Sequence, residues 1–148
     1  FSRIMSLKDG LKKMSKSELS DLSRINMTDE KDQIINKIKK AKTDPLPMPS
    51  SIGELDKRPE AKNLIGIYSS LTGATLEKSI NEFSGKNFSD FKNILSQVVV
   101  DKIIPISIEI KKLLQDKKHL DQILLEGVEK ADNIASQKIK KIHEIVGF

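Results

Sequence analysis

From Pro59 onwards, apolar residues recur every three or four positions, which is the spacing of one face of an α-helix. The first such stretch opens with a proline, a residue that suits the first turn of a helix, and ends at Gly73. Its apolar positions are Ala61, Leu64, Ile65, Tyr68 and Leu71. Such a face must pack against other helices, so the pattern predicts a mainly α fold.

Further helices are expected downstream. Thr75 can cap a short helix that runs through Phe83 and is closed by Gly85. Ser89 is predicted to cap the next helix, which Pro105 should kink or interrupt. The inward-facing positions of that helix are Phe91, Leu95 and Val98.

The longest helical pattern runs from about residue 117 to residue 146. Its apolar stripe consists of Val128, Ala131, Ala135, Ile139, Ile142 and Val146. Gly127 can weaken or bend this helix. No run of about 18 apolar residues occurs anywhere, so we expect no membrane span.

The N-terminal part is less regular. Residues 3–7 alternate weakly and predict a short strand that ends at Gly10, followed by a mobile polar loop to about Asp21. Thr28 is predicted to cap a helix whose buried stripe is Ile34, Ile38 and Ala41. The basic residues of its last turn, which complement the helix dipole, are Lys37, Lys39, Lys40 and Lys42. Three prolines within residues 45–49 then fix an extended connector.

Charge and composition limit the possible functions. The chain carries 26 basic and 21 acidic residues, a net charge of +5, and all but three of the basic residues are lysine. This excess mildly favours a nucleic-acid or polyphosphate partner, although a lysine-rich soluble surface explains it as well. The absence of cysteine excludes disulfides and thiolate metal sites. Because only His119 and His143 could add imidazole ligands, we expect no protein-bound metal.

The segment Lys13–Ser17 has the sequence Lys-Met-Ser-Lys-Ser. It places two ammonium groups three residues apart in a hydroxyl-rich loop after a predicted strand. Loops at the carboxyl ends of strands in open α/β sheets bind nucleotides, and Lys and Ser suit phosphate oxygens. A mobile cationic loop can close on a pyrophosphate as negative charge develops. A solvated linker has the same composition, so the chemistry alone leaves both possibilities open.

This segment resembles the KMSKS signature of class I aminoacyl-tRNA synthetases. Other segments resemble the tryptophanyl branch of that family, in the same order along the chain. They are residues 3–17, 40–44 and 58–64 with Ile67 and Tyr68, Gly85–Lys86 with Phe91–Lys92, Pro105–Ile106 and residues 127–131. The family's first signature, HIGH, has no counterpart here, so the resemblance implies a C-terminal fragment. Residues 1–23 would then end a Rossmann-like catalytic fold, and residues 24–148 would form a helical tRNA-binding region.

The resemblance implies that the full protein is a tryptophan–tRNA ligase, which activates tryptophan with ATP and transfers it to tRNA(Trp). Lys13 and Lys16 would be its catalytic charges, holding the triphosphate and stabilising the departing pyrophosphate. The ATP-binding residues implied are Ile4, Lys13, Met14, Ser15, Lys16 and Ser17. Ile4 would contact adenosine through its backbone and Met14 would lie beside adenine. Strand packing for Ile4 and a core-covering side chain for Met14 are the alternatives.

The same resemblance implies Mg²⁺ that arrives with ATP, a cytoplasmic homodimer with most of its interface upstream, and a fragment that is inactive alone. Four or more capped amphipathic helices can share a core, so we expect the fragment to fold by itself. The candidate tRNA contacts are Lys37, Lys40, Lys138, Lys140 and Lys141. For the first two, complementing a helix dipole is an equal explanation. The alternative functions are a free-standing basic helical module that only binds RNA, and a structural helix bundle.

Overall fold

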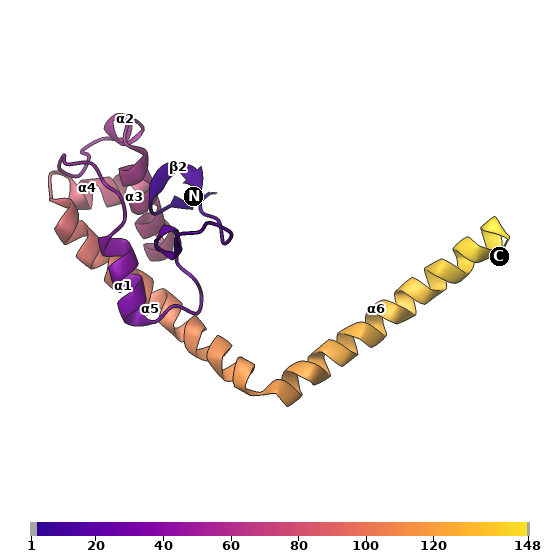
Figure 1. Cartoon of the computed structure of the whole chain (residues 1–148). Helices are drawn as coiled ribbons and strands as arrows, with labels where there is room; N and C mark the ends of the chain where they lie inside the picture. The colour runs from indigo at the N-terminus through magenta and orange to yellow at the C-terminus, as the bar shows by residue number, and fades with distance from the viewer. Residues whose placement is uncertain (1–2, 148) are drawn as a thin grey trace. The chain divides into compact units, whose positions relative to one another are not determined.

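The computed structural model describes residues 3–147, and it is mainly α-helical, as predicted (Figure 1). The helices are α1 (Lys31–Lys39), α2 (Ile52–Leu55), α3 (Pro59–Thr72), α4 (Leu76–Phe83), α5 (Phe88–Gln115) and α6 (Lys117–Val146). The chain divides into two compact units, Phe1–Ile108 and Glu109–Phe148. The division predicted after residue 23 falls inside the first unit, because Leu7 belongs to the same core as the helices that follow.

Two antiparallel strands, β1 (Met5–Ser6) and β2 (Asp9–Lys13), form an N-terminal hairpin. The paired positions are Met5 with Lys13 and Ser6 with Asp9, with a bulge between the pairs. The prediction that Gly10 ends a strand is wrong, because the turn lies at residues 7–8 and Gly10 belongs to β2. A β-carbon on Gly10 would lie 2.5 Å from the carbonyl carbon of Pro59, so only glycine lets β2 pack closely against α3.

α1 begins later than predicted. Glu30 occupies its N-cap, where the Glu30 N–H donates to the Gln33 side chain at 2.8 Å. Thr28 lies in the preceding turn, where Asp29 accepts a hydrogen bond from the Asn26 N–H at 2.9 Å. The predicted buried stripe is confirmed at Ile34, Ile38 and Ala41.

The predicted limits of α3 and α4 are confirmed. Pro59 occupies the first turn of α3, and Gly73 ends this helix in the left-handed conformation with φ of 72°. The Thr75 hydroxyl accepts a hydrogen bond from the Lys78 N–H at 3.2 Å and so caps α4. Local signals at helix ends therefore placed both elements.

α5 differs from its prediction at its start. Ser89 lies inside its first turn, and Asn87 takes the capping role by accepting a hydrogen bond from the Asp90 N–H at 2.8 Å. Of the two outcomes predicted for Pro105, a kink or an interruption, the interruption does not occur, because the helix continues through this residue. Phe91 and Leu95 are buried, as predicted.

The core of the first unit has an aromatic centre formed by Tyr68, Phe83 and Phe91. The ring centroids of Tyr68 and Phe83 lie 4.9 Å apart, and those of Phe83 and Phe91 lie 4.7 Å apart, both edge to face. Leu7 joins this core from the hairpin turn and Met48 joins it from the proline connector. The hairpin and the connector are thereby held to the helices.

α6 buries no residue, and the apolar stripe predicted along it is exposed. Gly147 ends this helix in the left-handed conformation, with φ of 85°. None of the helices within residues 3–147 combines the length and the apolar character that a membrane crossing requires.

Candidate functional site

Lys13 is the last residue of β2, and the chain leaves the hairpin there into an exposed loop that leads to the 3₁₀ helix η1 (Asp21–Ser23). The start of the loop is fixed, because the Met14 N–H donates to the Ile4 carbonyl oxygen at 3.1 Å. The half-buried Met14 side chain also packs against the core. The segment predicted to bind a nucleotide is thus a strand-end loop that is held at its first residue.

The middle of the loop makes contacts mainly within itself. The Oγ atoms of Ser15 and Ser17 lie 2.9 Å apart, and the Ser17 N–H donates to Ser15 Oγ at 3.3 Å. The side chains of Lys13 and Lys16 are exposed, and within residues 3–147 neither forms an ion pair. Two exposed ammonium groups without an internal counter-ion are available to a polyanion.

Ile4 and Met14 occupy different environments. Ile4 lies directly before β1 and is 44% exposed. Its carbonyl oxygen is occupied by the loop, through the Met14 N–H. The contact of Met14 with the core agrees with the alternative that its side chain covers the core.

Charged side chains hold the far end of the loop. Arg24 donates from Nη1 to the Glu18 carbonyl oxygen at 2.8 Å, and its Nη2 lies 3.0 Å from Asp21 Oδ1. Lys37 of α1 reaches Asp21 Oδ2 and Asp29 Oδ2, each at 2.6 Å. The hydrogen bond from Lys37 is the main cause that lowers the pKa of Asp21 below its ordinary value. The loop is therefore held at both ends.

The predicted tRNA contacts fall into different environments. The Lys37 side chain is 4% exposed and its ammonium is occupied by two carboxylates, so the structure speaks against a direct phosphate contact there. Lys40 is exposed. Lys42 bonds to Glu60 at 2.8 Å, and this hydrogen bond raises the pKa of Lys42. The exposed lysines predicted on α6 are Lys138, Lys140 and Lys141.

Asn63 of α3 fastens β1 to the helix, a role that we did not predict. Its Oδ1 accepts from the Met5 N–H at 2.8 Å, and its Nδ2 donates to the Met5 carbonyl oxygen at 2.9 Å. The residue is 2% exposed. The available signal was an uncharged polar side chain directly before the apolar pair Leu64–Ile65. Asn63 thus supports β1. β1 pairs with β2, the strand at whose end the loop begins.

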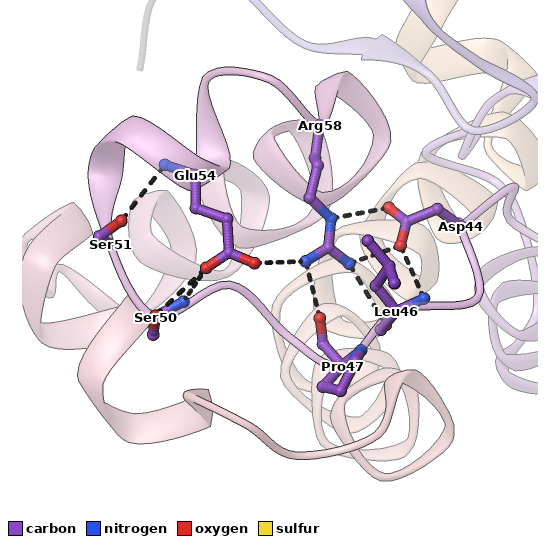
Figure 2. Close-up of polar contacts among 7 residues, drawn as sticks. All are labelled: Asp44, Leu46, Pro47, Ser50, Ser51, Glu54 and Arg58. Atoms are coloured by element: carbon purple, nitrogen blue, oxygen red, sulfur yellow. Dashed lines mark hydrogen bonds and ion pairs between the residues drawn. The ribbon is translucent and has the colours of Figure 1, made fainter.

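Arg58 fixes the proline connector between α1 and α2 (Figure 2). Its Nε and Nη2 donate to the two carboxylate oxygens of Asp44 at 2.9 Å and 2.6 Å, and Nη1 donates to the Pro47 carbonyl oxygen at 2.7 Å. Glu54 Oε1 accepts from Nη1 at 3.2 Å. Burial alone would raise the pKa of Asp44, but the hydrogen bonds from Arg58 and from the Leu46 N–H outweigh burial and lower it. Arg58 is thus a structural residue of the connector.

Lys92 of α5 closes the C-terminal end of α1. Its Nζ donates to the Ala41 carbonyl oxygen at 2.7 Å, and to the Lys39 carbonyl oxygen and Thr43 Oγ1 at 3.3 Å each. Burial lowers the pKa of Lys92. A cation at this end complements the helix dipole, a role that the sequence pattern had assigned to the helix's own lysines.

Family comparison places this arrangement in a known class. The family model described as tRNA synthetases class I (W and Y) matches residues 1–102, which include the hairpin, the loop and α1 to α4. The chain belongs to this family of class I tRNA synthetases for tryptophan and tyrosine.

Curated relatives are named for the tryptophan branch. The chain is 49% identical over 146 residues to the tryptophan–tRNA ligase of Agrobacterium fabrum, and 45% identical over 147 residues to that of Caulobacter vibrioides. Both alignments cover 99% of this chain, but they cover 41% and 43% of the relatives. The chain therefore spans less than half the length of these relatives, and its predicted resemblance to the tryptophanyl branch is confirmed.

Solved structures share the fold. The tryptophanyl-tRNA synthetase of Mycoplasma pneumoniae superposes with a TM-score of 0.71 at 25% identity, covering 99% of this chain and 45% of that one. The Campylobacter jejuni enzyme complexed with ADP and tryptophan gives a TM-score of 0.75 at 23% identity, over 99% and 44%, which shows a common fold. These comparisons favour the synthetase interpretation over a free-standing RNA-binding module.

Proposed function

We propose that this chain is part of a tryptophan–tRNA ligase and supplies its ATP and pyrophosphate loop together with helices on the tRNA side. The observation that carries the proposal is the position of Lys13–Ser17. Lys13 ends β2, and an exposed loop that contains Ser15, Lys16 and Ser17 follows, in a chain 49% identical to a tryptophan–tRNA ligase over nearly its whole length. Two exposed ammonium groups, held on a supported loop, match what a departing pyrophosphate requires.

The loop residues take distinct roles in the proposed reaction. A carboxylate oxygen of tryptophan attacks the α-phosphorus of ATP, and the bond to the bridging oxygen breaks as pyrophosphate leaves with the electron pair. Lys13 and Lys16 stabilise the charge that grows on this leaving group. The hydroxyls of Ser15 and Ser17, which bond to each other here, donate instead to phosphate oxygens. A ribose hydroxyl of tRNA(Trp) then displaces AMP from the adenylate.

Adenosine would be held at the base of the loop, by the backbone of Ile4 and the side chain of Met14. Mg²⁺ would enter with ATP and take its ligands from phosphate oxygens and water. In the described part of the chain, no group of three or more His, Cys, Asp or Glu residues is arranged to hold a metal ion. The loop offers ammonium and hydroxyl groups, which suit phosphate better than a cation.

The remaining expectations concern the whole protein. We propose a cytoplasmic homodimer that binds tRNA(Trp) through exposed lysines. The candidates are Lys40, Lys138, Lys140 and Lys141. Light scattering coupled to size-exclusion chromatography tests the dimer, for which a monomeric mass of the full-length enzyme is the opposing result.

The substitution Lys16→Ala in the full-length enzyme tests the proposed function. We expect tryptophan-dependent exchange of ATP and pyrophosphate to slow about 10²–10³-fold, with an unchanged KM for tryptophan. Single-turnover kinetics should place the loss in the chemical step. Lys78→Ala removes the same charge from an exposed position on α4 and should leave exchange unchanged. An unchanged chemical step with a raised KM for tryptophan would contradict the assignment.

A further inference from the structure

The two ends of the loop are held by different physical means. At Met14 the chain is still tied to the hairpin by a backbone hydrogen bond to Ile4. Among the described residues, no strand pairing follows Ser17. The far end of the loop is contacted by the Arg24 side chain, which donates a hydrogen bond to the Glu18 carbonyl oxygen. The Leu7 N–H also fixes η1 by donating to the Ser23 carbonyl oxygen at 2.9 Å, so between Ser17 and η1 the position of the loop depends largely on what holds Arg24.

Arg24 is held by Asn26, whose Oδ1 accepts from Arg24 Nε at 3.1 Å, and by Asp21, whose carboxylate joins two cations. Oδ1 lies 3.0 Å from Arg24 Nη2, and Oδ2 lies 2.6 Å from Lys37 Nζ. Lys37 projects from α1 and is 4% exposed, so it forms a fixed point in the core. Asp21, Arg24 and Lys37 form a continuous chain of contacts from α1 to the loop, which we term the ionic anchor.

The contact between Asp21 and Lys37 can be removed without a large loss of fold stability. The buried ammonium of Lys37 has a second partner, Asp29, at 2.6 Å, and that carboxylate is 6% exposed. The Asp21 side chain is 55% exposed. If Asp21 leaves, Lys37 keeps a buried counter-ion, so the large cost of an unpaired buried charge does not arise. An exposed carboxylate in such a pair can open at low cost.

We propose that the ionic anchor positions the loop's far end, and so sets the distance that Lys16 must travel to reach the departing pyrophosphate. Asp21, Arg24 and Lys37 are positioning residues, since none of them touches the reacting atoms. Lys16 lies two residues before Glu18, whose carbonyl oxygen Arg24 holds. The inference rests on the proposed function of the loop.

The test is Asp21→Asn in the full-length enzyme, which keeps the side-chain shape and removes its charge. We expect kcat/KM for ATP to fall about three- to tenfold with an unchanged KM for tryptophan, because a catalytic group is displaced while the amino-acid site is intact. Asp21→Glu restores the charge and should recover part of the loss. Asp56→Asn is the matched control, since Asp56 also bonds an ammonium at 2.6 Å, that of Lys62, on an exposed surface.

Limited trypsin digestion provides a readout that does not depend on activity. Cleavage after Lys16 should be faster in Asp21→Asn than in the parent enzyme, at an equal urea unfolding midpoint. Equal cleavage and equal ATP kinetics in the two proteins would overturn the anchor. If the parent enzyme itself lacks tryptophan-dependent exchange, the proposed function fails, and the cleavage rates alone decide the anchor. If Asp21→Asn does not fold, Arg24→Gln tests the same connection from its other side.

Discussion

The side-chain amide of Asn63 forms hydrogen bonds with both backbone polar groups of Met5. The Met5 N–H and carbonyl oxygen lie 2.8 Å and 2.9 Å from the amide of Asn63, in a site where that side chain is 2% exposed. A buried polar group left without a partner costs about 1–3 kcal/mol. Since β1 is two residues long and pairs with one strand, these bonds are a large part of what holds it.

Asn63→Ala is therefore expected to lower the free energy of unfolding by about 1–3 kcal/mol, measured by urea denaturation. Asn93→Ala is the control, because Asn93 is exposed on α5, and its effect should lie within about 0.5 kcal/mol of zero. Asn63→Asp keeps the acceptor but loses the donor, so it should not restore stability. Equal unfolding midpoints for the alanine variants at 63 and 93 would show that the Met5 contact is not stabilising.

Elements that carry their own end signals were predictable from the sequence. Pro59, Gly73 and Thr75 act through local geometry, and the structure has the helix ends where these residues place them. β2 was missed because its residues do not alternate between apolar and polar and because it contains a glycine; it is a strand through its pairing with β1 and packs closely against α3. The loop that follows Lys13 could be predicted from its lysine and serine motif. The residues that support the loop and its hairpin could not be predicted, because Lys37 and Asn63 contact residues that are distant from them in the sequence.

The packing of β2 on α3 predicts a sharp difference between two glycines. In Gly10→Ala the new β-carbon would lie 2.5–2.8 Å from backbone atoms of Pro59 and Glu60, so one element must shift. We expect a loss of about 1–3 kcal/mol in the free energy of unfolding. Gly53→Ala in α2 meets nothing within 4 Å and should be neutral or stabilising by up to about 1 kcal/mol. Urea denaturation of both variants checks this, and equal losses would contradict it.

The connector should make the first unit sensitive to acid. Hydrogen bonds to Asp44, Glu54 and Glu60 hold the pKa values of these carboxyls below their ordinary 3.8 for Asp and 4.5 for Glu. A carboxyl whose pKa is lower in the folded state contributes stability above its unfolded pKa and loses it as pH falls through the folded value. The free energy of unfolding should therefore decline below about pH 4.5.

Urea denaturation from pH 7 to pH 3 measures this decline. Asp44→Asn removes one of the titrating groups, so this variant should be less stable at pH 7 and should show a shallower fall towards pH 3. The expected sign is fixed by linkage, because the unfolded chain binds more protons than the folded one in this range. Parallel pH profiles for the two proteins would assign the acid sensitivity to other groups.

The molecule as a whole pairs a unit that holds the loop with a unit of exposed helix. The unit Glu109–Phe148 comprises the end of α5 and α6, and α6 carries both an apolar stripe and exposed lysines. Its secondary structure could be predicted from periodicity. The burial of its apolar face could not be predicted, because periodicity identifies a face that is able to pack but does not identify a partner that covers it.

Phosphate binding by lysines leaves a signature in the salt dependence of tRNA affinity. In the full-length enzyme, neutralising Lys138, Lys140 and Lys141 together should reduce the slope of log K against log salt by roughly 0.7–0.9 for each phosphate that the variant no longer binds. A second variant, at Lys39 and Lys40, tests the exposed end of α1. Adenylate formation should be unaffected by either change. An unchanged slope in both variants would show that these lysines do not bind the tRNA.

The bond between Met5 and Asn63 also sets an order of events during translation. The two residues are 58 positions apart, and at about 5–20 residues per second the ribosome needs roughly 3–12 s to make the intervening chain. During that time the hairpin lacks the helix that covers it, and a two-stranded hairpin alone is marginally stable in water. The hairpin therefore completes its assembly only after α3 is made. A ribosome that stalls within the proline connector would hold a nascent chain whose hairpin is not yet fastened by Asn63.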